Sequence, residues 1–151
     1  PSDYPVKAMA CVSTHDLPTL EGWWRGADID EKERLALLTS EAAAAERETR
    51  AQDKHAMLHA LRDAGLFDAT AADIAFDDAL AAALHRFAAG ARSFLAMTQL
   101  DDLAGETVAV NLPGTDAERP NWRRKLGPMV DKLFSTPRAA AIIDGIRRIS
   151  V

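Results

Sequence analysis

One short stretch of the sequence places a histidine and a carboxylate at the end of an apolar run. His15 and Asp16 follow the segment 7–12, whose small and β-branched residues predict a strand, and Pro18 then turns the chain away from helical geometry. Two aromatic residues come soon afterwards, Trp23 and Trp24. A polar pair at the carboxyl end of a strand, with aromatic rings in the following loop, is typical of the sugar site of a barrel enzyme.

Three blocks of the sequence, taken together, resemble one enzyme family. The first block, 13–24, reads Ser-Thr-His-Asp-x-Pro-Thr-Leu-x-Gly-Trp-Trp, and the others follow at 99–115 and 119–126. In content, order and spacing they are similar to the C-terminal part of the 4-α-glucanotransferases (amylomaltase or disproportionating enzyme, glycoside hydrolase family 77). A lone His-Asp pair would carry little weight, whereas three long blocks in the right order are hard to obtain by chance.

The resemblance implies a role for several polar residues. A retaining glycosidase needs a proton donor and a carboxylate nucleophile, and a further carboxylate can stabilise the flattened sugar of the transition state. Asp16 would be this third carboxylate, His15 would donate to a ring hydroxyl, and Asn111 would contact the bound glucose. The nucleophile and the acid/base would lie on earlier strands, outside this chain. Without the resemblance, Asp16 fits equally a loop residue that caps the turn before Pro18.

Other residues of these blocks keep two interpretations. Trp23 could stack on a glucose ring or pack behind the loop, and two adjacent tryptophans cannot face the same way. We expect Asp102 to order a loop or cap a helix. We expect 122–124 to pin the terminal segment to the body of the domain. The three remaining histidines are interpreted as ordinary surface or half-buried residues of helices: His55, His59 and His85.

Size sets the expected fold class. The 151 residues suffice for one domain with a core, whereas a complete eight-fold α/β barrel needs roughly 250. Together with this length, the resemblance implies an α/β chain that forms the C-terminal part of a (β/α)8 TIM barrel, predominantly helical with two short parallel strands. The single unit would comprise strand 7, a helical insertion at about 30–89, strand 8 and a terminal helix.

Local patterns place the elements. The strands are predicted at 7–12, covered on both faces, and at 94–98. Asp30 with Glu33 predicts a capping box at the start of one helix, and Asp77 predicts the cap of another. The remaining predicted helices cover a short turn at 21–25, the long segment 41–64, one turn at 71–76, then 78–89, a turn or short helix at 99–105, 122–126 and 138–148.

The composition and charge of the chain argue against several classes of partner and site. The net charge of −5 and the pI of about 5.3 argue against nucleic acid. The one cysteine, Cys11, excludes an internal disulfide and fits a small buried side chain of a strand. No run is apolar enough to predict a membrane span. We expect no metal site, because the histidines and carboxylates make no ligand set, and a cytoplasmic protein.

The resemblance implies part of a 4-α-glucanotransferase that transfers α-1,4-glucan segments between maltooligosaccharides by a retaining double displacement, without a cofactor. Two alternatives stay open: another glycosidase of the α-amylase superfamily, and a non-catalytic helical interaction module, since more than half of the chain reads as helix. A partial barrel leaves strand edges open, so self-association of the chain is also expected.

Overall fold

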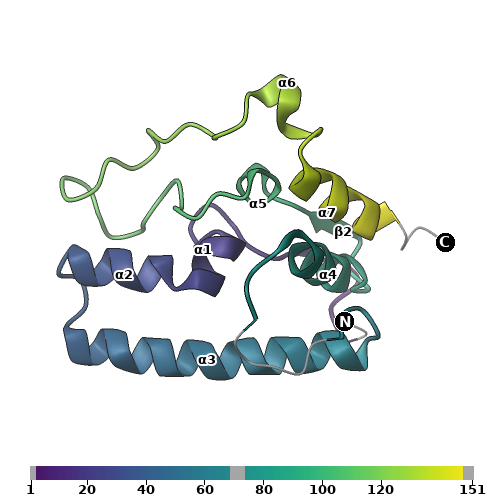
Figure 1. Cartoon of the computed structure of the whole chain (residues 1–151), viewed down its shortest axis with the longest axis horizontal. Coiled ribbons are helices and arrows are strands. Elements are labelled where there is room, and N and C mark those ends of the chain that lie inside the picture. Colours follow the sequence, from purple (N-terminus) through teal and green to yellow (C-terminus); the bar gives the residue numbers. More distant parts are fainter. Residues whose placement is uncertain (1–2, 69–73, 148–151) are drawn as a thin grey trace.

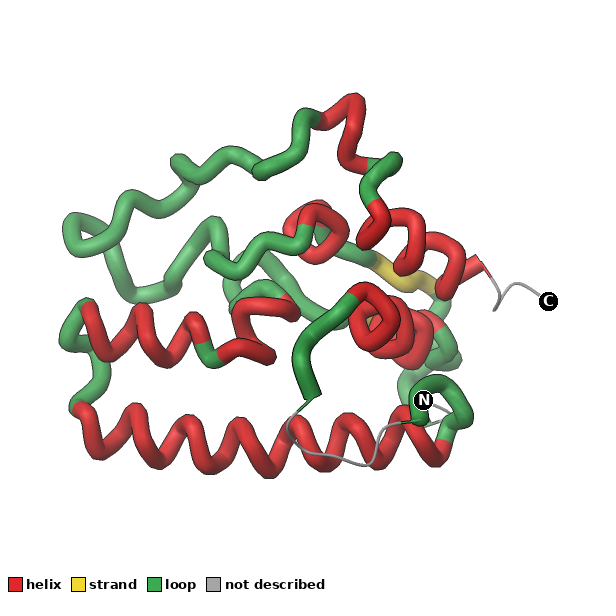
Figure 2. Tube along the Cα trace, viewed as in Figure 1, coloured by secondary structure: helices red, strands yellow, loops and turns green. Residues whose placement is uncertain are grey.

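The computed structural model describes residues 3–68 and 74–147, in which helices surround two short strands (Figures 1 and 2). The elements in chain order are β1 (Met9–Cys11), α1 (Leu20–Arg25), α2 (Ala27–Arg34), α3 (Ser40–Asp63), α4 (Asp78–Ala89), β2 (Leu95–Met97), α5 (Leu100–Ala104), α6 (Val130–Leu133) and α7 (Pro137–Arg147). The predicted strand–helix–strand–helix order is confirmed. No helix within these residues is both long and apolar enough to cross a membrane.

The two strands pair in parallel, with Ala10 opposite Ala96. The expectation that β1 is covered on both faces is wrong. Ala10 is buried, but Met9 on the other face is 49% exposed, and all three residues of β2 are exposed. The helix α4 packs against both strands, and the apolar side chains that point the other way meet solvent. The two strands therefore pair with each other within the described residues. Both carry more apolar side chains than these residues bury.

The core lies mainly between α4 and α7, which run side by side in Figure 1. Leu80 of α4 and Ile142 of α7 are fully buried. The approach is close at Gly145, where an added Cβ would lie 3.3 Å from the Ala82 carbonyl oxygen. The helix predicted at 138–148 thus serves as a cover for α4, and its start at Pro137 agrees with the preference of proline for a first helical turn.

The long helix α3 lies along α2 at the bottom of Figure 1 and is held to it by ion pairs. Arg50 donates to both oxygens of Asp28, at 2.9 and 2.8 Å. Arg47 reaches Asp30 at 2.6 Å and Glu33 at 2.8 Å. Most of the other α3 side chains are exposed, so the mixed charge of this helix forms a solvated face, as predicted.

Two predicted helix N-termini can be compared with the structure, and one of them is confirmed. The predicted cap Asp77 accepts a hydrogen bond from the Leu80 amide at 2.8 Å, which confirms it. The capping box at Asp30 is wrong, because α2 begins one turn earlier, directly after Gly26 in the left-handed conformation (φ 78°). Asp30 therefore lies inside the helix, where its carboxylate binds Arg47 instead of a backbone amide.

The segment 105–129 crosses the molecule without regular structure (Figure 2). The helix predicted at 122–126 is wrong: Trp122 has φ 62°, a left-handed conformation that interrupts a right-handed helix. The short helix α6 that follows was not predicted. Of the turn predicted at 71–76, residues 71–73 lie outside the described residues, and 74–76 are irregular.

Candidate active site

The parallel pairing brings the loops after β1 and β2 to the same edge of the sheet. Gln99, after β2, donates through Nε2 to Ser13 Oγ at 2.9 Å, and Ser13, after β1, donates to Asp102 Oδ2 at 2.7 Å. Parallel strands must present their carboxyl ends at one edge, so this contact follows from the topology. The loop that carries His15 and Asp16 and the segment 99–102 therefore lie at the same end of two neighbouring parallel strands.

Two polar side chains predicted for the site, Asn111 and His15, converge on Asp16. Asn111 donates through Nδ2 to Asp16 Oδ1 at 2.8 Å. His15 Nε2 lies 3.3 Å from Asp16 Oδ2, and the two side chains are 61% and 54% exposed. One oxygen of the carboxylate is thus held by a residue 95 positions away in sequence, the other has the imidazole beside it, and a ligand can still reach the group from solvent.

A cavity of about 290 Å³ adjoins this cluster. Its volume lies near the lower end of ligand pockets, which span roughly 300–1,000 Å³. The lining combines charged groups of α2 with apolar loop residues: Asp16, Leu17, Pro18, Asp28, Glu31, Lys32, Thr107, Ala109, Asn111, Leu112 and Pro113. Polar groups that converge beside a partly apolar wall are what an oligosaccharide site requires.

Beneath the cluster, Asp102 orders the loop, as predicted. Its buried carboxylate accepts from Ser13 and from the Leu20 amide at the start of α1, at 2.9 Å. Burial raises the pKa of Asp102, but contacts with His85, the Leu20 amide and Ser13 together outweigh burial and lower that pKa below its ordinary value. The chain that leads into His15 is therefore fixed from below by a charged group.

His85 contradicts its prediction as a surface or half-buried residue. Only 2% of it is exposed. Its Nδ1 lies 2.9 Å from the Ala81 carbonyl oxygen, and its Nε2 lies 3.6 Å from Asp102 Oδ2, beyond hydrogen-bonding distance. The ring faces inward because α4 turns this side towards the sheet and α5, which the helical spacing of leucines alone did not reveal.

Sequence reasoning missed two residues that fix the loop carrying Asn111. Asn121 Oδ1 accepts from the Leu112 amide at 3.0 Å and from Arg119 at 2.7 Å, while its Nδ2 donates to the Thr115 carbonyl at 3.0 Å. Arg119, 6% exposed, also donates to Glu31 at 3.0 Å. Both residues lie in the third sequence block, but only their contacts show that they hold a loop.

The three tryptophans take different places. Trp24 is buried and donates through its indole N–H to the Ile74 carbonyl at 2.9 Å, which makes it a core residue. Trp23 has the guanidinium of Arg50 over its ring, 4.3 Å from the centroid, and does not line the cavity at Asp16. Trp122 is 59% exposed, and its ring centroid lies 5.5 Å from that of His15. The expected role of Trp122 in pinning the terminal segment belongs to Arg124, which binds Asp101 at 2.7 Å.

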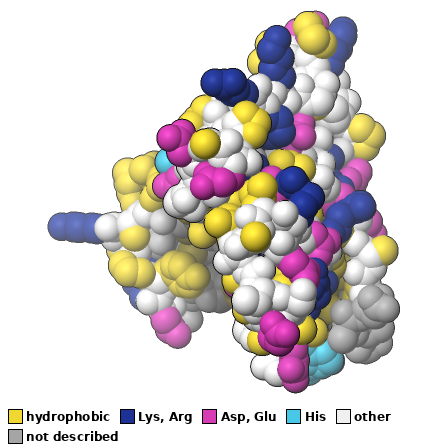
Figure 3. Space-filling view, turned by 90° about the vertical axis from the view of Figure 1, so that its left-hand side faces the viewer, with side chains coloured by type: hydrophobic (Ala, Val, Ile, Leu, Met, Phe, Trp, Pro, Cys, Tyr) yellow, Lys and Arg dark blue, Asp and Glu magenta, His cyan; other side chains and the backbone are white. Residues whose placement is uncertain are grey.

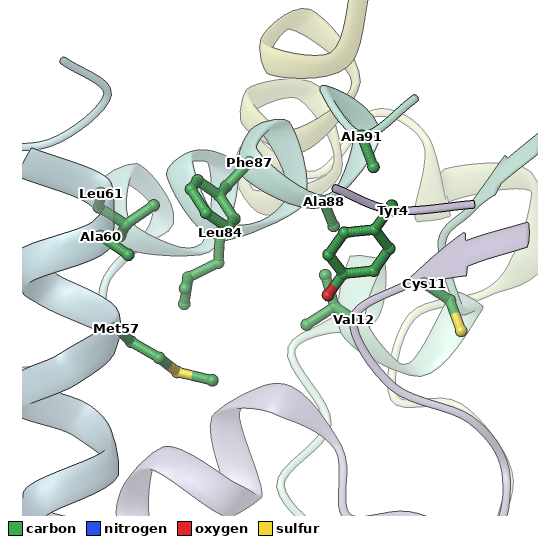
Figure 4. A pocket seen from close by; sticks show the side chains of 10 residues that line it. All are labelled: Tyr4, Cys11, Val12, Met57, Ala60, Leu61, Leu84, Phe87, Ala88 and Ala91. Carbon is green, nitrogen blue, oxygen red and sulfur yellow. The ribbon is translucent and has the colours of Figure 1, made fainter. Parts of the chain in front are cut away.

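A second, largely apolar cavity of about 210 Å³ lies between α3, α4 and the N-terminal segment (Figure 4). Figure 4 shows Met57, Leu84 and Tyr4 turned into it. Its lining has no carboxylate or histidine, so it offers no glycosidic chemistry. On the face shown in Figure 3, acidic and basic side chains are interspersed rather than gathered by sign. Within the described residues, no three side chains of the metal-binding types gather into a metal site.

The model of the 4-alpha-glucanotransferase family, glycoside hydrolase family 77, matches residues 1–130. The chain belongs to this family. It is 35% identical over 138 residues to a 4-alpha-glucanotransferase of Haemophilus influenzae and 34% identical over 145 residues to one of Mycobacterium bovis. These alignments cover 89% and 92% of this chain but 20% of each relative. The chain thus spans about a fifth of the length of the curated relatives it matches.

Among solved structures, the amylomaltase from Corynebacterium glutamicum superposes with a TM-score of 0.86 at 26% sequence identity, over 96% of this chain and 22% of the amylomaltase. The fold described above is therefore that of part of an amylomaltase. Membership of the family confirms the resemblance found in the sequence. It favours the transferase over the other α-amylase-type glycosidase and over the helical interaction module.

Proposed function

We propose that this chain supplies the transition-state-stabilising carboxylate, Asp16, to a 4-α-glucanotransferase. The enzyme would transfer α-1,4-glucan segments between maltooligosaccharides by a retaining double displacement. The nucleophile and the proton donor would come from other strands of a (β/α)8 barrel in which β1 and β2 are strands 7 and 8. We also propose a cytoplasmic location. No cofactor is proposed, because carboxylates carry out retaining glycosyl transfer without one.

The observation that carries this proposal is the exposed carboxylate at the carboxyl end of a parallel strand, with polar side chains beside both of its oxygens. Asn111 donates to Asp16 Oδ1 at 2.8 Å, and His15 Nε2 lies 3.3 Å from Oδ2. A preorganised anion stabilises positive charge that develops on the sugar, because it needs no reorientation during the reaction. A sugar that bears an oxocarbenium-like charge is the transition state of glycosyl transfer.

The neighbours of Asp16 receive the remaining roles. His15 and Asn111 present hydrogen-bonding groups beside the carboxylate and can share sugar hydroxyls with it. Trp23 is left out of the proposed site, because the guanidinium of Arg50 lies over its ring, 4.3 Å from the centroid. The substrate would lie in the groove between Asp16 and the 107–113 segment.

The test is Asp16→Asn in the full-length enzyme that contains this chain, with maltotriose as substrate. Asn keeps the shape and the contact partners but removes the charge, so kcat and kcat/KM should fall together by on the order of 10²-fold or more. The thermal melt should be unchanged. Asp131→Asn is the matched control, because its side chain is 66% exposed on α6 and lies outside the site.

An Asp16→Asn enzyme that melts normally and keeps more than half of its kcat would remove Asp16 from the catalytic set. It would instead support the alternative in which Asp16 only caps the turn before Pro18. The control should keep wild-type kinetics in either case.

A further inference from the structure

We propose that the indole of Trp122 forms an apolar wall on which a glucose ring of the substrate lies, next to Asp16. This makes Trp122 a substrate-binding residue in addition to His15 and Asn111. The inference rests on the proposed function, because it assigns a further contact to the same α-glucan site.

The first support is the position of the ring. Trp122 lies against His15, with the ring planes tilted by 49° and the centroids 5.5 Å apart. His15 in turn lies 3.3 Å from Asp16. The indole, the imidazole and the carboxylate therefore follow one another on the surface, and 59% of Trp122 remains exposed.

The second support is the backbone that holds the ring there. Trp122 has φ 62°, a conformation that is a genuine outlier for a bulky residue and costs on the order of 1 kcal/mol or more. Such strain persists only where surrounding contacts enforce it, and it gathers at functional sites. Since the ring stays largely in solvent, core packing does not account for this conformation.

The enforcing contacts belong to the loop described above. The Trp122 amide donates to the Val110 carbonyl at 2.9 Å. The preceding residue, Asn121, is bound to Leu112, Thr115 and Arg119. The same hydrogen bonds thus hold both Trp122 and the loop that carries Asn111. The amide of Asn111 and the indole of Trp122 are therefore in place before a ligand binds. Preorganisation of this kind lowers the entropic cost of binding.

The chemistry of this pair of groups fits a pyranose. A glucose ring has apolar C–H faces and hydroxyl groups around its edge. An aromatic face can cover the former while Asn111, His15 and Asp16 bind the latter. An indole is suited to this, because it supplies a large rigid surface with few torsions to restrict. Of the other two tryptophans, one is buried in the core and one lies under Arg50.

The first experiment compares Trp122→Ala and Trp122→Phe in the full-length enzyme with maltotriose. Loss of the aromatic face should raise KM on the order of 10-fold and change kcat less, whereas Phe should restore most of the affinity. Phe134→Ala is the matched control, since Phe134 is an exposed aromatic residue (57%) next to α6. That variant should keep the wild-type KM.

The second experiment detects the contact directly. Maltotriose is titrated into Asp16→Asn enzyme, which we expect to be catalytically impaired, and tryptophan emission is recorded with and without Trp122→Phe. A saccharide-dependent emission change that disappears with Trp122→Phe supports the wall. The same change in both proteins overturns it.

The two proposals fail in different ways. A wild-type enzyme without transferase activity on maltotriose would refute the proposed function. An active wild-type enzyme, impaired by Asp16→Asn but with a KM within twofold of wild type after Trp122→Ala, would refute the wall alone. Equal losses in Trp122→Ala and Trp122→Phe would also refute it, because they would show that the residue does not act through an aromatic face.

Discussion

Replacing Asp102 by asparagine should destabilise the 151-residue chain by about 3 kcal/mol at pH 7. The carboxylate is buried and accepts two hydrogen bonds, from Ser13 at 2.7 Å and from the Leu20 amide at 2.9 Å. Its third neighbour is His85 Nε2, which lies 3.6 Å away and has no partner within hydrogen-bonding distance in the described part of the chain. Asn preserves the volume, so the variant isolates the effect of charge and acceptor capacity.

The magnitude follows from these contacts. The Asn oxygen can still accept from Leu20, but its amide group faces the Ser13 hydroxyl and cannot accept from it. A hydrogen bond to a charged group contributes about 1.5–3 kcal/mol, and a buried polar group left without its partner costs about 1–3 kcal/mol. Asn loses one such bond and leaves the Ser13 hydroxyl without its acceptor, so we expect the two effects together to cost about 3 kcal/mol. With a urea m-value of about 2 kcal/mol/M, this shifts the midpoint by roughly 1.5 M.

The dependence on pH has a definite sign. The pKa of Asp102 in the folded chain is held below its ordinary value by contacts that outweigh burial, and the unfolded value is about 3.9. The charged carboxylate therefore contributes its full stabilisation above about pH 4, and the contribution is lost as the pH falls through the folded-state pKa. The stability difference between wild type and Asp102→Asn should be constant near neutrality and shrink in acid.

Urea unfolding followed by circular dichroism checks this, at two protein concentrations so that association is recognised. Asp131→Asn on α6, where the side chain is 66% exposed, should stay within about 0.5 kcal/mol of wild type. A difference below about 0.5 kcal/mol for Asp102→Asn at pH 7, or one that grows on acidification, would refute the reasoning.

Three further predictions concern other parts of the chain. Gly22→Ala should lower the free energy of unfolding by about 1–3 kcal/mol, since the new Cβ would lie 2.2 Å from the Thr107 carbonyl oxygen; an unchanged urea midpoint would contradict that contact. Ala36→Gly should raise stability by about 0.5 kcal/mol, because exposed Ala36 has φ 55°, where a side chain costs about 1–2 kcal/mol; a lower melting temperature would count against it. The 151-residue chain alone should release no glucose from maltotriose, since in the proposed mechanism Asp16 is neither nucleophile nor acid; detectable glucose would contradict this. The same chain should self-associate through exposed apolar residues of β2; a monomer by light scattering at high concentration would contradict that.

Local sequence determined those features that depend on neighbours in the chain. Asp77 caps α4 because its carboxylate needs to reach only three residues ahead, and the apolar runs give strands because alternation acts within a few residues. The position of His15 and Asp16 at a strand end follows in the same way. The family resemblance supplied Asn111, and its convergence with Asp16 agrees with the hydrogen bond between them.

Tertiary structure alone decided the rest. The burial of His85 depends on which side of α4 meets α5, and the clamp of Arg119 on Glu31 joins residues 88 positions apart. The left-handed conformation of Trp122, which replaced a predicted helix, is enforced by hydrogen bonds to the 110–115 segment. Such contacts have no period and no fixed spacing, because they arise from the path of an irregular loop. For this reason the sequence determined the polar groups of the proposed site, and only the fold revealed the side chains that hold them and the indole beside them.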